Sequence, residues 1–382
     1  MKFIQYLRIS WLYLLVLCGF QAYSQNTVTS GFYKHFQGKL DASMNITLDL
    51  LSHNGTVSGY YYYSFPEPGK PSTLHYGKTI AVRGTISNGK ISFTELNNPE
   101  SQFSGSLVND NEISGFWQKS LIDKAVPFRV EENYSNGSIP LSCYAVKDEQ
   151  LLFNGKNADK ASPRAKIEIN ILFPLAGQDG QTNDSLKQLI SKLLLKNNKE
   201  IISPMKFLGK LKNDYFDSYI KSSEGIADVS NAKSFNREKN INMQVAYNEN
   251  QLLSIVLKKF AKTGNSPGME MDKYFVFSSA LNRQLSINDI ITENGLPLLD
   301  GLLNTKLRKL NGVKPGESLK DAGFFTEEIS HNNNFYINND GIGFLYNIYE
   351  IAPGSMGTTA LFVSFRELDK SILKPGILPY PR

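Results

Sequence analysis

Residues 335–354 read FYINNDGIGFLYNIYEIAPG, and this stretch is the clearest indication of the fold. Apolar and aromatic residues flank the turn sequence 338–341, in which asparagine and glycine tolerate the positive φ that a tight turn requires. We therefore predict a β-hairpin centred on this turn. Pro353 and Gly354 predict a sharp corner after the second strand, because proline fixes φ and glycine permits tight geometry.

The sequence before this hairpin mixes strand and helix patterns from about residue 165 onward. Residues 166–173 alternate like a strand, and Asn183 or Asp184 can cap a helix with apolar residues at helical spacing. An α+β domain with an antiparallel sheet is therefore predicted. Its further elements are a helix at 207–220, strands at 240–247, 252–258 and 274–279, helices at 297–310 and 319–325, and a strand at 360–365.

This order of elements resembles the C-terminal domain of RsiV-like proteins, a family of unknown function. The family includes the outer part of lysozyme-sensing anti-sigma factors and the non-catalytic part of PdaC-type peptidoglycan deacetylases. The corresponding pieces are the helix-rich opening, residues 285–291 after a strand, and the closing hairpin with Gly357. The resemblance covers residues 165–370 and implies a binding domain at the bacterial cell envelope.

The resemblance also implies candidate ligand-binding residues around the corner. Lysozyme-sensing members bind lysozyme through surface loops of this domain, which here makes Tyr349, Glu350, Pro353 and Ser355 the candidates. A structural alternative is that Glu350 and Pro353 only hold the backbone corner. The signalling members also need a cytoplasmic segment and a membrane helix, and this chain has a signal peptide in their place.

Residues 27–133 follow a different, all-β pattern of short β-branched and aromatic segments separated by turn residues. Asn54-Gly55 and Asn88-Gly89 mark hairpin turns. Glycines within strands, such as Gly59 and Gly115, mark the bends or bulges that a small closed barrel needs. We therefore predict an up-and-down meander of about six to eight strands, as a small barrel or a strongly coiled sheet.

These patterns divide the chain into five parts. They are a signal peptide at 1–24, the meander domain at 27–133, a turn-rich linker at 134–163 with some strand around 142–146, the α+β domain at 165–370, and an extended tail at 371–382.

The run Tyr60 to Tyr63 and the pair Phe116-Trp117 allow two interpretations. In the first, Tyr60, Tyr62 and Trp117 form a stacking surface for a glycan ring. In the second, alternate aromatic residues simply face the core and the solvent, and the inner tyrosines have a partner for the hydroxyl group. The second interpretation is favoured because tyrosine is a common strand residue.

The N-terminus has the pattern of a secretory signal peptide. Lys2 and Arg8 form a basic segment, residues 11–20 are almost wholly apolar, and Ala22-Tyr23-Ser24 supplies small residues before a cleavage site. The mature chain is therefore expected to begin at Gln25.

Cys18 offers a lipoprotein alternative, but Leu17 is bulky where that processing requires a small residue. No later segment approaches the roughly 20 apolar residues of a membrane helix. We therefore expect a periplasmic or secreted protein that is soluble once processed.

Charge and motif content argue against several functions. Removing Lys2 and Arg8 from the formal net charge of +5 leaves +3, which is too small to indicate nucleic-acid binding. The four histidines lack zinc-site spacing, and no Gly-x-Ser-x-Gly motif occurs. After removal of the signal peptide, which contains Cys18, Cys143 is the single remaining cysteine, and we expect it to be buried and structural. We expect no metal, no cofactor and no catalytic residues.

Three functions remain open at this point. The leading hypothesis is an exported, non-enzymatic envelope protein that binds lysozyme or a peptidoglycan or other glycan ligand. The second is a small-ligand carrier whose meander encloses a pocket, which an interior filled by Tyr and Phe side chains would exclude. The third is a hydrolase, which requires clustered His, Asp, Glu or Ser side chains in a cleft.

Overall fold

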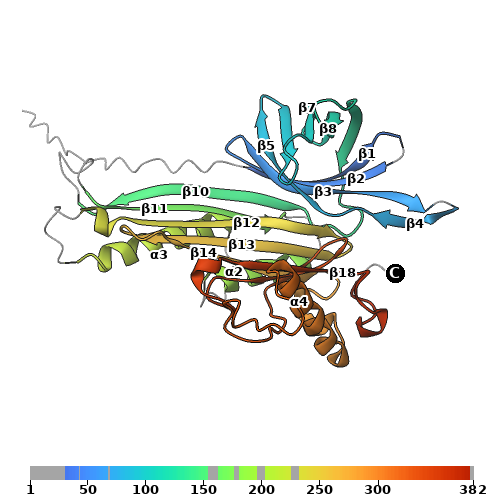
Figure 1. The fold of residues 1–382 in the computed structure, drawn as a ribbon. Coiled ribbons are helices and arrows are strands. Elements are labelled where there is room, and N and C mark those ends of the chain that lie inside the picture. The colour runs from blue at the N-terminus through green and yellow to red at the C-terminus, as the bar shows by residue number, and fades with distance from the viewer. Residues whose placement is uncertain are drawn as a thin grey trace, which may run out of the picture.

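A computed structural model describes residues 31–42, 44–67, 69–153, 162–175, 180–195, 203–224 and 232–378. The predicted signal peptide, including Cys18, lies outside these described residues. A β-barrel lies on one face of a long six-stranded sheet, and helices α2, α3 and α4 lie on the opposite side (Figure 1). This arrangement confirms the predicted fold class of an all-β N-terminal meander and an α+β C-terminal domain.

The N-terminal meander closes into an eight-stranded antiparallel barrel. Each strand pairs with the next in the up-and-down order, and β9 returns to pair with β1. Asn54-Gly55 and Asn88-Gly89 form the predicted turns with positive φ. The barrel strands are β1 (Phe32–Leu40), β2 (Met44–His53), β3 (Thr56–Glu67), β5 (Ile80–Ser87), β6 (Lys90–Glu95), β7 (Gln102–Val108), β8 (Glu112–Gln118) and β9 (Val126–Glu132), and β4 (Lys70–Tyr76) forms a hairpin with the far end of β3.

Gly59 has a different role from the predicted bulge. The β2–β3 register continues through this residue without interruption. A Cβ atom at Gly59 would clash with the backbone carbonyl oxygen of Asp49 on the neighbouring strand. The glycine is therefore needed for close approach of two strands, as a tightly coiled small barrel requires.

Aromatic side chains fill the interior of the barrel. Phe103 stacks on Phe93 at 4.7 Å between ring centroids and meets Phe128 edge-on at 5.2 Å. Tyr61 also packs against Phe103, and its hydroxyl donates to Glu95 at 2.6 Å. This packing of the interior argues against the pocket that the small-ligand carrier hypothesis places inside the barrel.

The six-stranded sheet contains one parallel pair, β11–β12, and is otherwise antiparallel. Residues 141–151, which were predicted as linker with only some strand, form a long strand paired with β11 along its whole length. The sheet strands are β10 (Leu141–Leu151), β11 (Arg164–Pro174), β12 (Arg237–Glu249), β13 (Leu252–Thr263), β14 (Met269–Ser278) and β15 (Arg283–Leu285).

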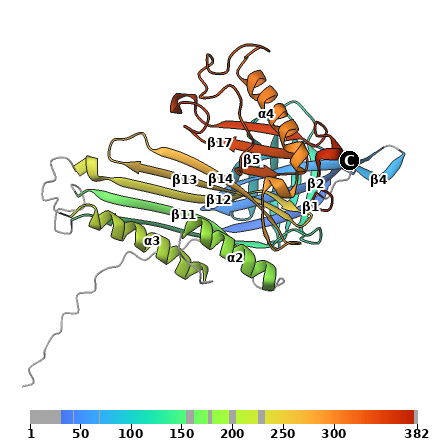
Figure 2. The same ribbon diagram turned by 90° about the horizontal axis from the view of Figure 1, so that it is seen from below.

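Two helices connect β11 to β12 and cover the face of the sheet away from the barrel (Figure 2). They are α2 (Gly180–Leu194) and α3 (Pro204–Lys221), and Phe207 of α3 packs edge-on against Phe173 of β11 at 5.4 Å. The predicted cap at Asn183 or Asp184 is wrong, because α2 begins at Gly180. The side chain of Asn183 instead donates from inside the helix to the Leu175 carbonyl at 3.0 Å.

The closing hairpin forms as predicted. Asn338 and Gly341 close its turn with a 3.0 Å backbone hydrogen bond, and a third strand completes a small sheet against which α4 packs. These elements are β16 (Phe335–Ile337), β17 (Gly341–Tyr346), β18 (Thr359–Ser364) and α4 (Leu296–Leu310), and the short 3-10 helices are η1 (Ala232–Phe235), η2 (Ile287–Asp289), η3 (Glu293–Gly295), η4 (Gly354–Met356) and η5 (Lys370–Ile372).

Two predictions near the C-terminus are wrong. Residues 319–325 form turns and no helix, because Gly323 takes a φ of 97° and a Glu327 carboxylate oxygen binds the Leu319 amide at 2.9 Å. The tail is not extended where the structure describes it. Lys374 donates its backbone N–H to the Ile290 carbonyl at 2.7 Å, and residues 375–377 form a turn.

Candidate functional site

Three neighbouring barrel strands bring His35, Asp49 and Tyr60 into one row. His35 is opposite Asp49 in the β1–β2 register, and Asp49 is opposite Tyr60 in the β2–β3 register. Side chains that face each other across neighbouring strands lie on the same face of a sheet. That face is the outside of the barrel, where the six-stranded sheet covers it, so all three residues are buried, with exposed fractions of 0%, 2% and 4%.

Hydrogen bonds tie this row to the sheet beneath it. One carboxylate oxygen of Asp49, Oδ1, accepts from the Tyr33 hydroxyl and lies 2.9 Å from His35 Nδ1. Asn248 of β12 donates from Nδ2 to the Tyr33 hydroxyl oxygen at 2.8 Å. The buried cluster is therefore shared between the barrel and the sheet.

Glu249, the last residue of β12, forms a second connection between the two parts. Its carboxylate accepts hydrogen bonds from Gln37 at 2.8 Å, from Asn136 at 3.1 Å and from the Tyr62 hydroxyl. Glu249 is itself buried. Tyr62 thus holds the barrel to the sheet through a charge-assisted hydrogen bond.

The electrostatic environment favours the charged form of His35. Burial alone would lower the pKa of the imidazole, but the Asp49 carboxylate, its hydrogen bond and the nearby Glu249 together raise that pKa above its ordinary value. Burial and then the charge of Asp49 raise the pKa of Tyr33 well above its usual range. The cluster is therefore best described as an imidazolium–carboxylate pair with a neutral tyrosine.

A groove lies between the barrel and the six-stranded sheet, and we call it the interdomain groove. Its inner part has a volume of about 350 Å³ and its outer part about 690 Å³. Strands β2, β3 and β5 form the barrel wall, and β11, β12 and β13 form the sheet wall. The two parts adjoin, because Leu51, Ser58, Arg83, Asn242 and Gln244 line both.

Amide side chains dominate the sheet wall of the groove. Asn240, Asn242 and Gln244 occupy alternate positions of β12 and therefore lie on one face, and Asn170 of β11 is opposite Asn242 in the parallel register. Each amide offers both donors and acceptors. The wall is thus suited to a ligand rich in hydroxyl or amide groups.

Charged groups in the groove are few. The Lys258 ammonium is held at 2.9 Å by Asp272, and Glu168 pairs with Lys147 at 3.0 Å. Arg83 extends from the barrel wall and is exposed. Burial lowers the pKa of His53, which lines the outer part, so this imidazole is neutral near pH 7.

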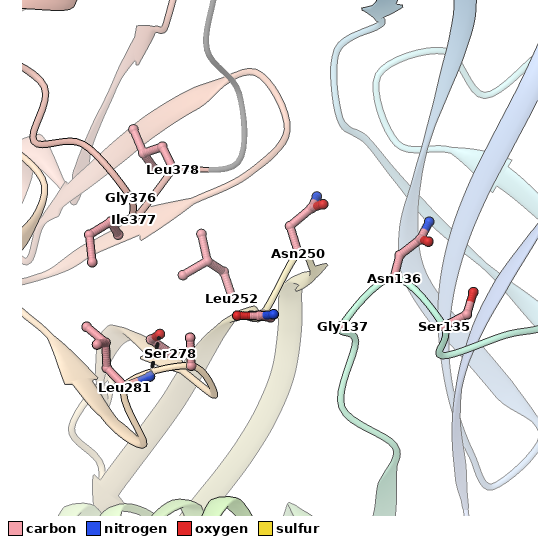
Figure 3. Close-up of a pocket in the computed structure, with 12 residues that line it drawn as sticks. Ser135, Asn136, Gly137, Asn250, Leu252, Ser278, Leu281, Gly376, Ile377 and Leu378 are labelled. Carbon is pink, nitrogen blue, oxygen red and sulfur yellow. Dashed lines mark hydrogen bonds between the residues drawn. The ribbon is translucent and has the colours of Figure 1, made fainter. Parts of the chain in front are cut away.

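A second hollow of about 470 Å³ lies at the end of the β12–β13 hairpin. Figure 3 shows tail residues 376–378 on one side of it and residues 135–137 on the other. Backbone hydrogen bonds from Asn250 to Asn136 and from Gln251 to Gly137 fix the second side. The described residues that line this hollow are all uncharged, so it offers less chemistry than the groove.

The structure does not bring Tyr60, Tyr62 and Trp117 together as a stacking surface. Tyr60 and Tyr62 are buried under the six-stranded sheet. The prediction that alternate tyrosines of this strand face the solvent is therefore wrong. Trp117 packs toward the barrel interior, and its indole N–H donates to Ser101 Oγ at 3.0 Å. Phe116 is exposed, which confirms the predicted alternation at this pair.

The corner residues lie together but outside the groove. Glu350 accepts from the Asn347 backbone N–H and from Asn332 Nδ2, both at 2.8 Å, which holds the corner as the structural alternative predicted. Tyr349 is 64% exposed and has a φ of 65°, which is uncommon for a bulky residue. Pro353 and Ser355 are exposed beside it.

Cys143 is buried, as predicted, and its thiol contacts Asn170 Oδ1 at 2.8 Å. Burial raises the pKa of this thiol to about 12. Among the described residues, no group of three or more His, Cys, Asp or Glu side chains is placed to hold a metal ion. Within the same ranges, no helix combines the length and the apolar composition that crossing a membrane would require.

Sequence reasoning missed the residues that form the groove. One signal was available at Asp49, a charged residue between Leu48 and Leu50 on a predicted strand. Because Asn54-Gly55 was predicted as a two-residue turn, Asp49 should lie opposite Tyr60. The turn therefore predicted this pairing. It did not predict that a second sheet covers the two residues.

Comparison with known proteins bears on the C-terminal part. The family described as "Protein of unknown function (DUF3298)" matches residues 288–366, which include α4 and the closing hairpin. The chain contains a DUF3298 domain. This match does not confirm the more specific resemblance to RsiV-like or PdaC-type proteins. No curated protein matches the chain.

Two solved structures resemble the chain. A DUF3298 family member from Bacteroides fragilis NCTC 9343 is 24% identical, with a TM-score of 0.55, over 63% of this chain and 95% of that one. A DUF3298 family protein from Pseudomonas aeruginosa PAO1 is 15% identical, with a TM-score of 0.44, over 63% of this chain and 96% of that one. The first likeness shows a shared fold.

Proposed function

We propose that this protein is an exported, non-enzymatic binding protein of the bacterial cell envelope. Its ligand is a polar, hydroxyl-rich chain, such as a peptidoglycan strand or another glycan, held in the interdomain groove. The observation that carries the proposal is the amide row Asn240, Asn242 and Gln244 facing the barrel wall across a groove of several hundred Å³.

The two walls of the groove complement sugar chemistry. Amides on the sheet side face hydroxyl groups of Thr56, Ser58 and Thr85 on the barrel side. Sugar hydroxyls both donate and accept hydrogen bonds, and these side chains do the same. The outer part of the groove, at about 690 Å³, lies within the roughly 300–1,000 Å³ typical of small-molecule sites.

Export is part of the proposal and rests on the N-terminal sequence. The basic residues Lys2 and Arg8, the apolar residues 11–20 and the small residues 22–24 favour cleavage after Ser24. Cell fractionation with N-terminal sequencing tests it. A mature chain that begins at Gln25 outside the cytoplasm supports the proposal, and a full-length chain in the cytoplasm contradicts it.

The proposal is non-enzymatic in part because the buried His35–Asp49 pair is closed off from the groove. His35 is fully buried and is not among the residues that line either part of the groove. Asp49 Oδ1, which faces His35, is already occupied by Tyr33. A general base must reach the proton that it abstracts, and this buried pair does not reach a ligand in the groove. We therefore assign the pair a role in stabilising the fold.

Binding of soluble peptidoglycan strands to the mature chain, measured by calorimetry, tests the ligand. Asn240→Ala removes one amide from the groove wall and should weaken binding by up to about tenfold, as expected for one hydrogen bond. Asn97→Ala is the matched control, because Asn97 is an exposed amide outside the groove. Equal affinity of the two variants, or no retention of glycan by the wild type, contradicts the proposal.

A protein ligand such as lysozyme is the second candidate, and the corner favours it. Tyr349, Phe325 and Met356 are exposed there, and the Phe325 N–H bonds to the Ile351 carbonyl at 2.9 Å, which places Phe325 beside the corner. Aromatic residues and methionine are enriched at protein interfaces. A lysozyme pull-down with wild type and Tyr349→Ala separates this candidate from the groove, because only corner binding depends on Tyr349.

A further inference from the structure

Arg83 of β5 places a positive charge on the wall of the interdomain groove. It lines both the inner and the outer part of the groove, and its side chain is exposed there. Among the described residues, none forms a hydrogen bond or an ion pair with its guanidinium group. This group has five N–H donors and stays charged at any ordinary pH. All five donors are therefore available to a ligand in the groove.

The strands around Arg83 supply no carboxylate to balance its charge. Residues that lie opposite one another on neighbouring strands share a face of the sheet, as do alternate residues of one strand. The residues that surround Arg83 on the outer face of the barrel are all uncharged. They are Thr56, Ser58 and Tyr60 of β3, Ala81 and Thr85 of β5, and Ser92 and Thr94 of β6. The charge of Arg83 is thus left to the solvent or to a ligand.

The other charged side chains that line the groove each have a partner of opposite charge. The pairs are Asp49 with His35 at 2.9 Å, Lys258 with Asp272 at 2.9 Å, and Glu168 with Lys147 at 3.0 Å. His53 adds no charge near pH 7, because burial lowers its pKa. Among the described residues that line the groove, Arg83 therefore carries the one charge that no partner balances.

The surroundings of Arg83 suit a carboxylate that is attached to a sugar. The planar guanidinium fork matches the two oxygens of a carboxylate. Asn242 and Gln244 line both parts of the groove on the sheet wall and add amide N–H donors. Leu96 is 54% exposed, lines the inner part, and donates its backbone N–H to the Ala81 carbonyl at 2.9 Å. It therefore offers apolar surface beside β5 for the methyl groups of an acidic sugar.

We infer that Arg83 forms a subsite for a carboxylate group of the ligand in the interdomain groove. This inference rests on the proposed function and narrows it to acidic glycans, such as a strand that contains N-acetylmuramic acid with its lactyl carboxylate. The carboxyl terminus of a peptide offers the same chemistry. The experiment therefore includes both sources.

The test compares ligands that differ only in the negative charge. The mature chain is titrated by calorimetry with a tetramer of alternating N-acetylglucosamine and N-acetylmuramic acid. It is also titrated with the same tetramer after conversion of the lactyl carboxylates to neutral methyl amides. The second pair is N-acetyl-alanyl-alanine and its carboxyl-terminal amide. The expected result is about fivefold tighter binding of the acid tetramer, which corresponds to about 1 kcal/mol, the upper end for an exposed ion pair.

Two substitutions of Arg83 and one control assign this preference. Arg83→Gln removes the charge and should lower the affinity for the acid tetramer to about that for the neutral one. Arg83→Lys keeps the charge without the fork and should keep part of the preference. Arg366→Gln is the matched control, because Arg366 is exposed, has no ion-pair partner among the described residues and lines neither part of the groove. It changes the net charge equally and should keep the full preference.

The outcomes separate the inference from the proposed function. If wild type binds the acid tetramer no tighter than the neutral one, the carboxylate subsite is wrong while glycan binding stands. If only the acid dipeptide binds, the subsite stands and the glycan proposal falls. If neither tetramer binds and the dipeptides bind equally or not at all, both fall. An acid preference that Arg83→Gln keeps, or that Arg366→Gln loses to the same extent, overturns the assignment to Arg83.

Discussion

Asp49 is the residue at which the stability of the fold and the chemistry of the groove meet. Its Oδ1 atom lies within the buried contact with Tyr33 and His35, and Asp49 is also among the residues that line the inner part of the groove. A buried carboxylate is stable only when it is paired or hydrogen-bonded. The imidazole of His35 supplies that pairing, which makes the protonation of His35 important for the whole interface.

The pKa of His35 leads to a pH-dependent stability. The folded-state pKa is raised above the roughly 6.5 expected for the unfolded chain. The pair therefore contributes its full stability below about pH 6.5 and loses it as pH rises through the raised folded-state value. Urea unfolding of wild type and His35→Gln at a series of pH values should show a stability difference that shrinks as pH rises.

The partly exposed His75 provides the control for that experiment. His75→Gln is a matched substitution, because His75 lies outside the buried cluster, and it should change the free energy of unfolding little. A wild-type advantage over His35→Gln that is constant or grows with pH would contradict the assignment of a charged His35.

Tyr62 and Tyr60 form a matched pair for testing the value of a buried hydroxyl. Both are buried on the same face of β3, but the Tyr62 hydroxyl donates to Glu249, whereas the Tyr60 hydroxyl lies beside Asp49, a carboxylate that already accepts from Tyr33 and contacts His35. Tyr62→Phe should lower the free energy of unfolding by about 1–3 kcal/mol, because a buried carboxylate loses a donor. Tyr60→Phe should cost much less. Chemical denaturation of the two variants measures this, and equal costs would contradict the described network.

The sequence could predict which of these residues face each other but not what covers them. The Asn54-Gly55 turn sets Asp49 opposite Tyr60 by local chemistry alone. Whether the outer face of that hairpin meets solvent depends on a sheet formed by residues that are distant in sequence. A period-two pattern with tyrosine on the outer face is compatible with either outcome.

At the scale of elements, the turns and the amphipathic helices were predictable because their signals are local. The hairpins at 54–55, 88–89 and 338–341 and helix α3 all formed where the pattern placed them. Strand β10 was largely missed because its stability comes from pairing with β11, and its sequence is flanked by turn residues. The helix expected at 319–325 failed because Gly323 takes a φ of 97°, which lies outside the helical region.

Gly59 provides a test of the tightly coiled barrel. Gly59→Ala places a methyl group against the Asp49 carbonyl oxygen on β2, so the two strands must separate. We expect a loss of about 1–3 kcal/mol in the free energy of unfolding, as for other overpacked sites. Gly209→Ala is the control, because nothing lies within 4 Å of a Cβ in the middle of α3. That change should stabilise by up to about 1 kcal/mol.

Thermal or urea unfolding of the two glycine variants gives the comparison directly. If Gly59→Ala is as stable as wild type, β2 and β3 do not approach as closely as described. If Gly209→Ala is destabilised, the position is not an open helical site.

At the scale of the whole molecule, polar contacts of the described residues join the barrel both to the six-stranded sheet and to the closing hairpin. The first attachment is the cluster around Asn248 and Glu249. The second is Asn339 of the closing hairpin, which accepts from Thr79 at 2.6 Å and donates to the Gly77 carbonyl at 2.7 Å. The groove lies between the same barrel and sheet, so its width depends on both attachments.

Glu249 tests whether the two parts unfold together. Its carboxylate accepts from Gln37, Asn136 and Tyr62, and Glu249→Gln replaces one acceptor oxygen by an NH₂ group that faces donors. We expect a loss of about 2–3 kcal/mol, within the range for hydrogen bonds to a charged group. Because this loss falls on the interface, the single calorimetric transition expected of wild type should split into separate barrel and sheet transitions.

Glu131→Gln is the control, since Glu131 is exposed in the barrel and pairs only with Arg129 among the described residues. A uniform shift of one transition in Glu249→Gln, no larger than in Glu131→Gln, would show that the barrel and the sheet are coupled by other contacts.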